Sequence, residues 1–144
     1  MNETQRAKAI LLAENSNYTC VLCRAKETLT ATKKGIAPMM EFLDSGADLH
    51  GFCAADRIVG KAAALLFVLA GVVDVYAEVI TKEAVSILEN AGIGVSFGTC
   101  TEHIINREGT GLCPMELTVR EIDDPEKARF EIRKTMQRLV KKDC

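Results

Sequence analysis

The middle of the chain alternates regularly between short β-branched apolar segments and helical segments, and this alternation is its most restrictive feature. Each of the two helical segments is followed by a glycine, the usual residue for a left-handed helix stop. Successive strand–helix–strand units imply parallel strands joined by right-handed crossovers. The pattern therefore predicts an α/β fold, with strands at Leu49–Ala55, Val72–Val79 and Ile93–Phe97 and helices at Arg57–Ala70 and Lys82–Ala91.

The flanking segments add helices and a hairpin to this alternation. Asp124 followed by Pro125 is a typical helix start, and it predicts a last helix that ends near Lys142. Together the elements predict a single domain over residues 1–144, a three-layer α/β/α fold with a mixed sheet. The remaining expected elements are a helix at Glu3–Glu14, hairpin strands at Tyr18–Arg24 and Thr28–Thr32, and a helix at Ile36–Asp44.

Composition excludes several classes of partner. The 144 residues include 18 Lys and Arg against 20 Asp and Glu, so no excess of positive charge is present to hold nucleic acid or an anionic membrane. The longest uncharged apolar run, Ala62–Val73, is shorter than the roughly 20 residues that cross a bilayer. The first eleven residues carry Glu3, Arg6 and Lys8 and contain no secretory apolar stretch. We therefore expect a cytoplasmic protein with reduced thiols.

A binding site is expected where the parallel strands end. Ligands of open α/β sheets bind outside the carboxyl ends of the strands, at the N-termini of the following helices. Asp56 and Thr81 stand at the expected N-caps of two such helices, and Arg57 and Lys61 add positive charge. A phosphate-bearing ligand would be held there. In the alternative interpretation Asp56 is only a cap, Lys61 is a surface cation, and Gly60 allows close packing of the helix on the sheet.

A glycine-rich segment, residues 105–116, follows the last predicted strand. It carries Asn106 and Arg107, and loops of this composition often cover a site. Thr101–Arg107 is expected to form one or two helical turns. The alternative is an ordinary connector in which Cys113 is buried.

The six cysteines and two histidines suggest two kinds of chemistry. Three pairs have metal-like spacing, Cys20/Cys23, His50/Cys53 and Cys100/His103. The first two pairs fall in predicted strands, where residues three apart point to opposite faces, so we expect no metal and no other cofactor. A nucleophilic thiol remains an alternative, with Cys100 or Cys113 as the nucleophile and His103 as the base.

The order of elements is combined with two sequence strings, DRIVGKAAA at 56–64 and NREGTGLCPME at 106–116. In both respects the chain resembles an uncharacterised family of small proteins. The family's fold is similar to that of cytidine deaminases, and it has no settled activity. Zinc deaminases carry a His or Cys, Ala, Glu triplet at the first crossover helix and Pro-Cys-x-x-Cys at the next. Here those places are expected at residues 58–60 and 80–83, and neither holds a zinc ligand. The resemblance thus implies a deaminase-like fold without the zinc site.

These observations favour a protein that binds a nucleotide-derived or phosphorylated small molecule. Two alternatives stay open, a cysteine-dependent enzyme and a non-catalytic interaction subunit. The expected partner is a small molecule rather than nucleic acid or a membrane, and assembly into a homo-oligomer is undecided. The ligand site is expected at Asp56, Arg57 and Lys61 first, followed by Thr81, Asn106 and Arg107.

Overall fold

The computed structural model describes residues 2–105, 109 and 111–142. Its strands form one five-stranded mixed sheet in the order β2-β1-β3-β4-β5. β1 pairs antiparallel with β2 and with β3, whereas β3, β4 and β5 run parallel. This confirms the α/β class and the mixed sheet. The strands are β1 (Cys20–Arg24), β2 (Glu27–Ala31), β3 (Cys53–Val59), β4 (Asp74–Thr81) and β5 (Gly94–Thr101).

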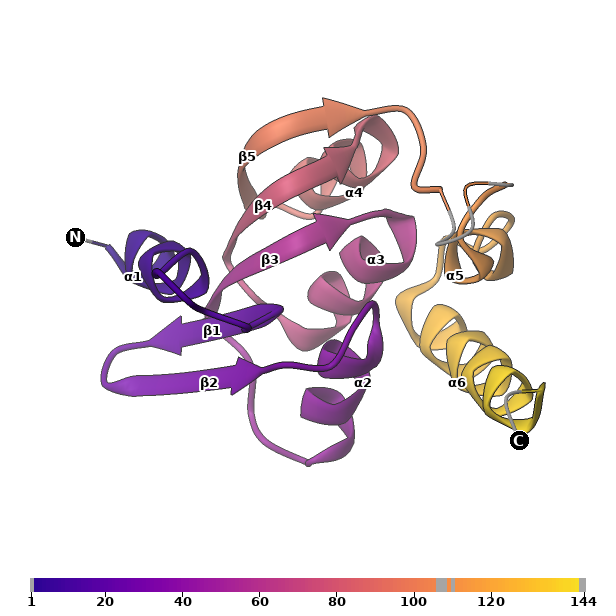
Figure 1. The fold of residues 1–144 in the computed structure, drawn as a ribbon, viewed down its shortest axis with the longest axis horizontal. Helices are drawn as coiled ribbons and strands as arrows, with labels where there is room; N and C mark the ends of the chain where they lie inside the picture. Colours follow the sequence, from indigo (N-terminus) through magenta and orange to yellow (C-terminus); the bar gives the residue numbers. More distant parts are fainter. Residues whose placement is uncertain (1, 106–108, 110, 143–144) are drawn as a thin grey trace.

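Helices cover both faces of the sheet, as three layers require (Figure 1). On one face α1 packs against β1, β3 and β4, and a small core forms there around Leu11, Val21 and Tyr76. On the other face α3 contributes Leu66 and Phe67 to the main core, and α6 packs against α3 from outside. The helices are α1 (Glu3–Leu11), α2 (Ala37–Asp44), α3 (Lys61–Ala70), α4 (Lys82–Asn90), α5 (Pro114–Thr118) and α6 (Pro125–Lys142).

Local signals placed several helix ends correctly. Gly71 adopts φ 81° and ends α3, and the Thr81 side chain accepts a hydrogen bond from the Ala84 N–H at the start of α4. Asp124 accepts from the Lys127 N–H at 2.9 Å and begins α6. Because these caps involve residues within one helical turn, the sequence alone was sufficient to predict them.

The predicted strand Leu49–Ala55 was wrong in position. The chain turns at this point: Gly51 has φ 83°, and the Phe52 N–H bonds to the Leu49 oxygen. β3 therefore starts only at Cys53 and continues to Val59, so Asp56 lies inside a strand and is not an N-cap. Gly60 is the N-cap residue of α3 instead.

The first crossover lies earlier in the chain than predicted. β1 is antiparallel to both of its neighbours, so β2 and β3 run in the same direction with β1 between them. The helix that connects them is α2, whereas the sequence placed the first crossover helix at Arg57–Ala70.

β5 is longer than predicted and extends to Thr101. The helical turns expected over Thr101–Arg107 are absent from the described part of that segment, residues 101–105, and an isolated bridge joins Ile105 to Leu112. Among the described residues, no helix has the length and apolar character needed to cross a membrane.

Candidate functional site

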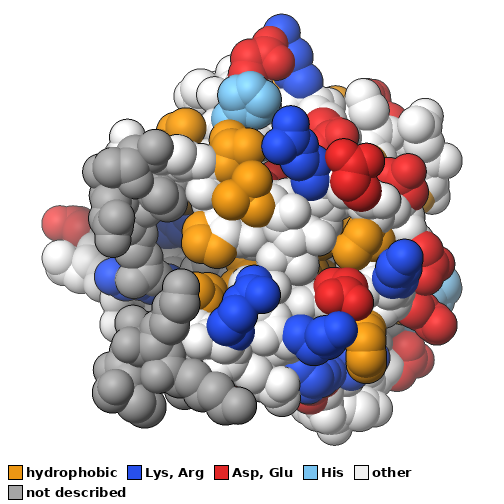
Figure 2. All heavy atoms as spheres, turned by 90° about the vertical axis from the view of Figure 1, so that its right-hand side faces the viewer, with side chains coloured by type: hydrophobic (Ala, Val, Ile, Leu, Met, Phe, Trp, Pro, Cys, Tyr) orange, Lys and Arg blue, Asp and Glu red, His pale blue; other side chains and the backbone are white. Residues whose placement is uncertain are grey.

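The three parallel strands end side by side, as the topology predicts, and a pocket lies at the ends of β4 and β5. In Figure 1 the arrowheads of β3, β4 and β5 point toward α5. Figure 2 looks onto this end of the molecule, where hydrophobic side chains lie beside acidic and basic ones. The pocket has a volume of about 330 Å³ and is lined by Thr81, Glu83, Glu102, His103, Ile104, Leu112, Glu116, Arg120 and Glu121.

The described lining of this pocket is acidic. It contains four glutamates and a single arginine, Arg120. Glu102 forms an ion pair with Lys82 at 2.5 Å, and this hydrogen bond lowers the pKa of Glu102 and raises that of Lys82. Glu83 and Glu121 form no hydrogen bond or ion pair with the described residues. Among the described residues, these two carboxylates of the lining therefore have no partner.

Glu116 occupies the N-terminus of α3. Its Oε1 accepts the Lys61 N–H at 2.8 Å, and its Oε2 accepts the Ala62 N–H at 3.0 Å. A Cβ atom on Gly60 would lie 2.2 Å from Glu116 Oε1, so only glycine lets the carboxylate approach this closely. The helix N-terminus that the sequence offered to a phosphate is bound by the chain's own carboxylate.

Lys61 is buried and does not face the pocket. Its side chain is 5% exposed, and its Nζ donates to the Arg120 oxygen at 3.2 Å and to Asp123 at 3.0 Å. The surface position in the alternative interpretation was therefore wrong. Lys61 ties the segment before α6 to the start of α3.

Arg57 and Asp56 lie in β3 and are bound within the fold. Arg57 donates to the backbone oxygens of Tyr18 and Leu11 and forms an ion pair with Glu78 at 3.0 Å. Asp56 is 7% exposed, and its carboxylate accepts the Arg57 N–H at 2.8 Å. Burial raises the pKa of Asp56 to about 7. Both side chains have partners within the fold, and neither lines the pocket.

The structure does not assemble Cys100, His103 and Cys113 into a catalytic group. No hydrogen bond joins any two of these described side chains, and of the three only His103 lines the pocket. Cys100 lies exposed in β5, so the helical turn expected to bring His103 onto it is missing. Cys113 precedes α5, and its N–H donates to the Ile104 oxygen. Cysteine catalysis remains a prediction without geometric support.

Cys20 and Cys23 pack into the two cores. Cys20 is buried in the main core and Cys23 in the core under α1, so the two thiols lie on opposite faces of the sheet as expected. Burial raises the pKa of both. Within the described ranges, no three His, Cys, Asp or Glu side chains gather in a way that would hold a metal ion.

Two predicted ligand residues, Asn106 and Arg107, lie outside the described residues. Sequence reasoning missed Glu102, Arg120 and Glu121 as pocket residues. Glu102 lies between the singled-out Cys100 and His103, so its position at the strand end was a usable signal. No sequence signal pointed to Arg120 and Glu121. They follow α5 and line the pocket only because the fold places that helix beside the strand ends.

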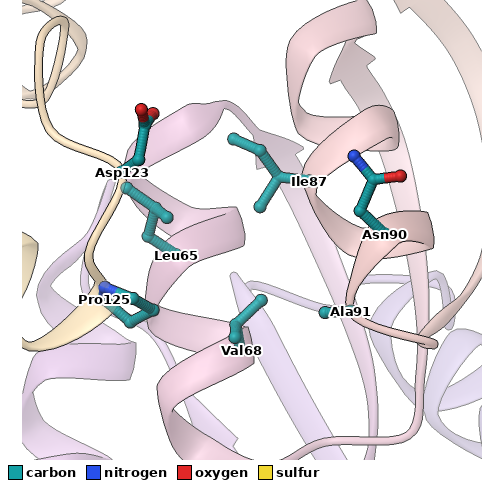
Figure 3. Close-up of a pocket in the computed structure, with 7 residues that line it drawn as sticks. All are labelled: Leu65, Val68, Ile87, Asn90, Ala91, Asp123 and Pro125. Carbon is teal, nitrogen blue, oxygen red and sulfur yellow. The ribbon is translucent and has the colours of Figure 1, made fainter.

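A second hollow of about 400 Å³ lies between α3 and α4 (Figure 3). Leu65 and Val68 from α3 face Ile87 from α4 across it, and Asp123 and Pro125 border it. It is open and largely apolar, and it contains none of the residues predicted to bind a ligand.

Comparison with known proteins identifies the family. A family model described as TM1506, a domain of unknown function (DUF1893), matches residues 7–136. The chain belongs to the DUF1893 family. The predicted resemblance to a family without settled activity is thus confirmed at this level. No curated protein matches the chain.

A solved DUF1893 structure has the same fold. The crystal structure of a DUF1893 family protein (TM1506) from Thermotoga maritima superimposes with a TM-score of 0.80. It is 24% identical in sequence, and the match covers 93% of this chain and 90% of that one. The similarity extends over almost the full length, so the α/β arrangement described above is common to both DUF1893 proteins.

Proposed function

We propose that this chain is a deaminase-fold domain without a zinc site, and that its strand-end pocket binds a small nucleotide-derived molecule. The order of elements supports the fold assignment: a helix, a hairpin, then alternating helices and strands in the sheet order β2-β1-β3-β4-β5. Fold similarity alone is a weak argument for a ligand. The chemistry of the pocket therefore carries the proposal.

Zinc does not fit this chain. The first two crossover helices, whose starts would hold the zinc ligands of a deaminase, are α2 and α3. α2 starts with Ala37-Pro38-Met39 and α3 with Lys61-Ala62-Ala63, and neither start carries His, Cys or Glu. Hydrolysis by zinc-bound water is therefore no part of the proposal.

The pocket favours a ligand rich in hydrogen-bond donors. Carboxylates accept hydrogen bonds, and Glu83 and Glu121 have no partner among the described residues. Amino groups of a nucleobase and hydroxyl groups of a sugar are suitable donors, and Ile104 and Leu112 offer apolar surface to a ring. The same carboxylates would repel a phosphate, since the described lining sets four glutamates against the single arginine, Arg120. Lys61 and the N-terminus of α3, which could attract a phosphate, are bound elsewhere. Of the two expected ligand classes, the pocket thus favours a nucleoside or nucleobase over its phosphorylated form.

Thermal unfolding with matched ligands tests this proposal. We expect one or more nucleosides or bases to raise the Tm of the protein, and the corresponding 5′-monophosphates to raise it less. Glu83→Gln should reduce the ligand-induced shift. Glu89→Gln, at the other end of α4, is the matched control and should leave the shift unchanged. A panel without any shift, or larger shifts with the monophosphates, would overturn the proposal.

A further inference from the structure

The outer edge of β5 is exposed and uncharged in the described part of the fold. In the described sheet β5 pairs only with β4, so its outer edge presents backbone N–H and C=O groups without a strand partner. The strand is eight residues long, GVSFGTCT, and contains no charged residue and no proline. Most of its residues are exposed, and Phe97 is 44% exposed. Exposed strands of this kind invite another strand to pair with them.

The opposite edge of the same sheet is protected, which makes the contrast informative. β2 begins with the charged residue Glu27, and Lys26 precedes it. Arg6 reaches from α1 and donates to the backbone oxygens of Ala25 and Glu27 and to the Thr28 hydroxyl. Charge and a covering side chain are the usual devices that prevent edge pairing. Both devices are present at β2, and no charged residue lies within the described strand β5.

The shape of β5 also suits close approach by a strand. Gly94, Ser96 and Gly98 alternate along the side of β5 that faces the α1 layer, since a Cβ on Gly98 would lie 3.7 Å from the Tyr76 hydroxyl. These small residues leave a low surface beside the edge. On the other side α4 packs against β5, so a helix borders the exposed Phe97 face.

We propose that two copies of this chain pair through their β5 strands in antiparallel orientation and form one continuous ten-stranded sheet. A two-fold axis through the middle of β5 brings identical strands together antiparallel, so each copy supplies the partner that the other lacks. Eight residues extend over about 27 Å. The sheet and the α4 layer are each about 10 Å thick, so the contact face is about 27 Å long and about 20 Å wide on each copy. Both copies together would bury roughly 1,100 Å², close to the lower limit for a specific interface. The dimer is therefore expected to be weak and concentration-dependent.

Sedimentation equilibrium over a range from low micromolar to near millimolar tests the dimer. A reducing agent is present throughout, so that a disulfide through the exposed Cys100 cannot produce one. We expect the average mass to rise from the monomer value of 15.7 kDa toward twice that value. Amide hydrogen exchange in β5 should slow over the same concentration range.

Charge variants at the two edges separate edge pairing from other association. Thr99→Lys places a charge on β5 and should weaken dimerisation at least tenfold. Thr30→Lys on the β2 edge is the matched control and should leave it unchanged. Circular dichroism and Tm establish that both variants fold. A wild-type protein that stays monomeric at every concentration, or a dimer equally insensitive to both substitutions, would overturn the proposal.

Discussion

The Glu116 carboxylate accepts the backbone N–H of Lys61 at 2.8 Å, and this bond fixes α5 to the start of α3. The neighbouring Ala62 N–H bonds to the second carboxylate oxygen. The Lys61 side chain strengthens the same junction, because its Nζ donates to the backbone oxygen of Arg120 and to the carboxylate of Asp123. One wall of the pocket thus depends on a carboxylate at a helix N-terminus.

Removing this carboxylate should destabilise the protein. Glu116→Ala leaves two N–H groups at a part-buried helix start without their acceptor, and we expect a loss of roughly 1–3 kcal/mol in the free energy of unfolding. Glu116→Gln keeps one acceptor oxygen and should lose less. Urea unfolding measures both. Equal stability of wild type and Glu116→Ala would show that the contact contributes nothing.

Gly60 should be intolerant of a side chain for the same reason. A Cβ there would lie 2.2 Å from Glu116 Oε1 and 2.6 Å from Ile104 Cδ1, so Gly60→Ala must displace both neighbours. We expect the substitution to be destabilising in the wild type and less so in a Glu116→Ala background. A double-mutant cycle from urea unfolding provides the coupling energy. Strict additivity of the two substitutions would contradict the contact.

Asp56 should make stability depend on pH. Its pKa is 3.8 ordinarily and about 7 in the fold, because burial disfavours the charged form. Between these values the folded state keeps a proton that the unfolded state releases, so Asp56 reduces stability progressively as pH rises from about 4 to about 7. Above that range the loss is complete and on the order of 4 kcal/mol.

The variant Asp56→Asn isolates this effect. Its amide oxygen can still accept the Arg57 N–H, but it carries no charge. The stability of the variant minus that of the wild type should therefore be largest near pH 8 and should fall by a few kcal/mol toward pH 4. Urea unfolding at several pH values measures it. A difference that stays constant with pH would be inconsistent with a buried titrating carboxyl.

Alkylation of the native protein should follow the exposure of the thiols. Among the described cysteines, iodoacetamide should modify the exposed Cys100 first, and Cys20 only after unfolding, because Cys20 is fully buried and burial raises its pKa. Peptide mass spectrometry over time measures the order. Rapid modification of Cys100 well below pH 8 would instead support the cysteine-dependent enzyme.

The candidate site was only partly accessible from the sequence. The strand-end rule correctly brought Thr81 and His103 into one pocket, because parallel strands in successive crossovers end at the same edge. It did not indicate that Lys61 turns away, since that depends on Arg120 and Asp123, which lie about 60 residues further along the chain.

The sequence by itself determined the order of elements as far as β5, the helix ends at Gly71, Thr81 and Asp124, and the opposite faces of Cys20 and Cys23. These follow from caps within one turn and from the two-residue period of a strand. Tertiary structure alone decided the start of β3 at Cys53, the burial of Asp56 and the capping of α3 by Glu116. The physical reason is that burial and capping there depend on partners distant in the chain, which no local pattern encodes.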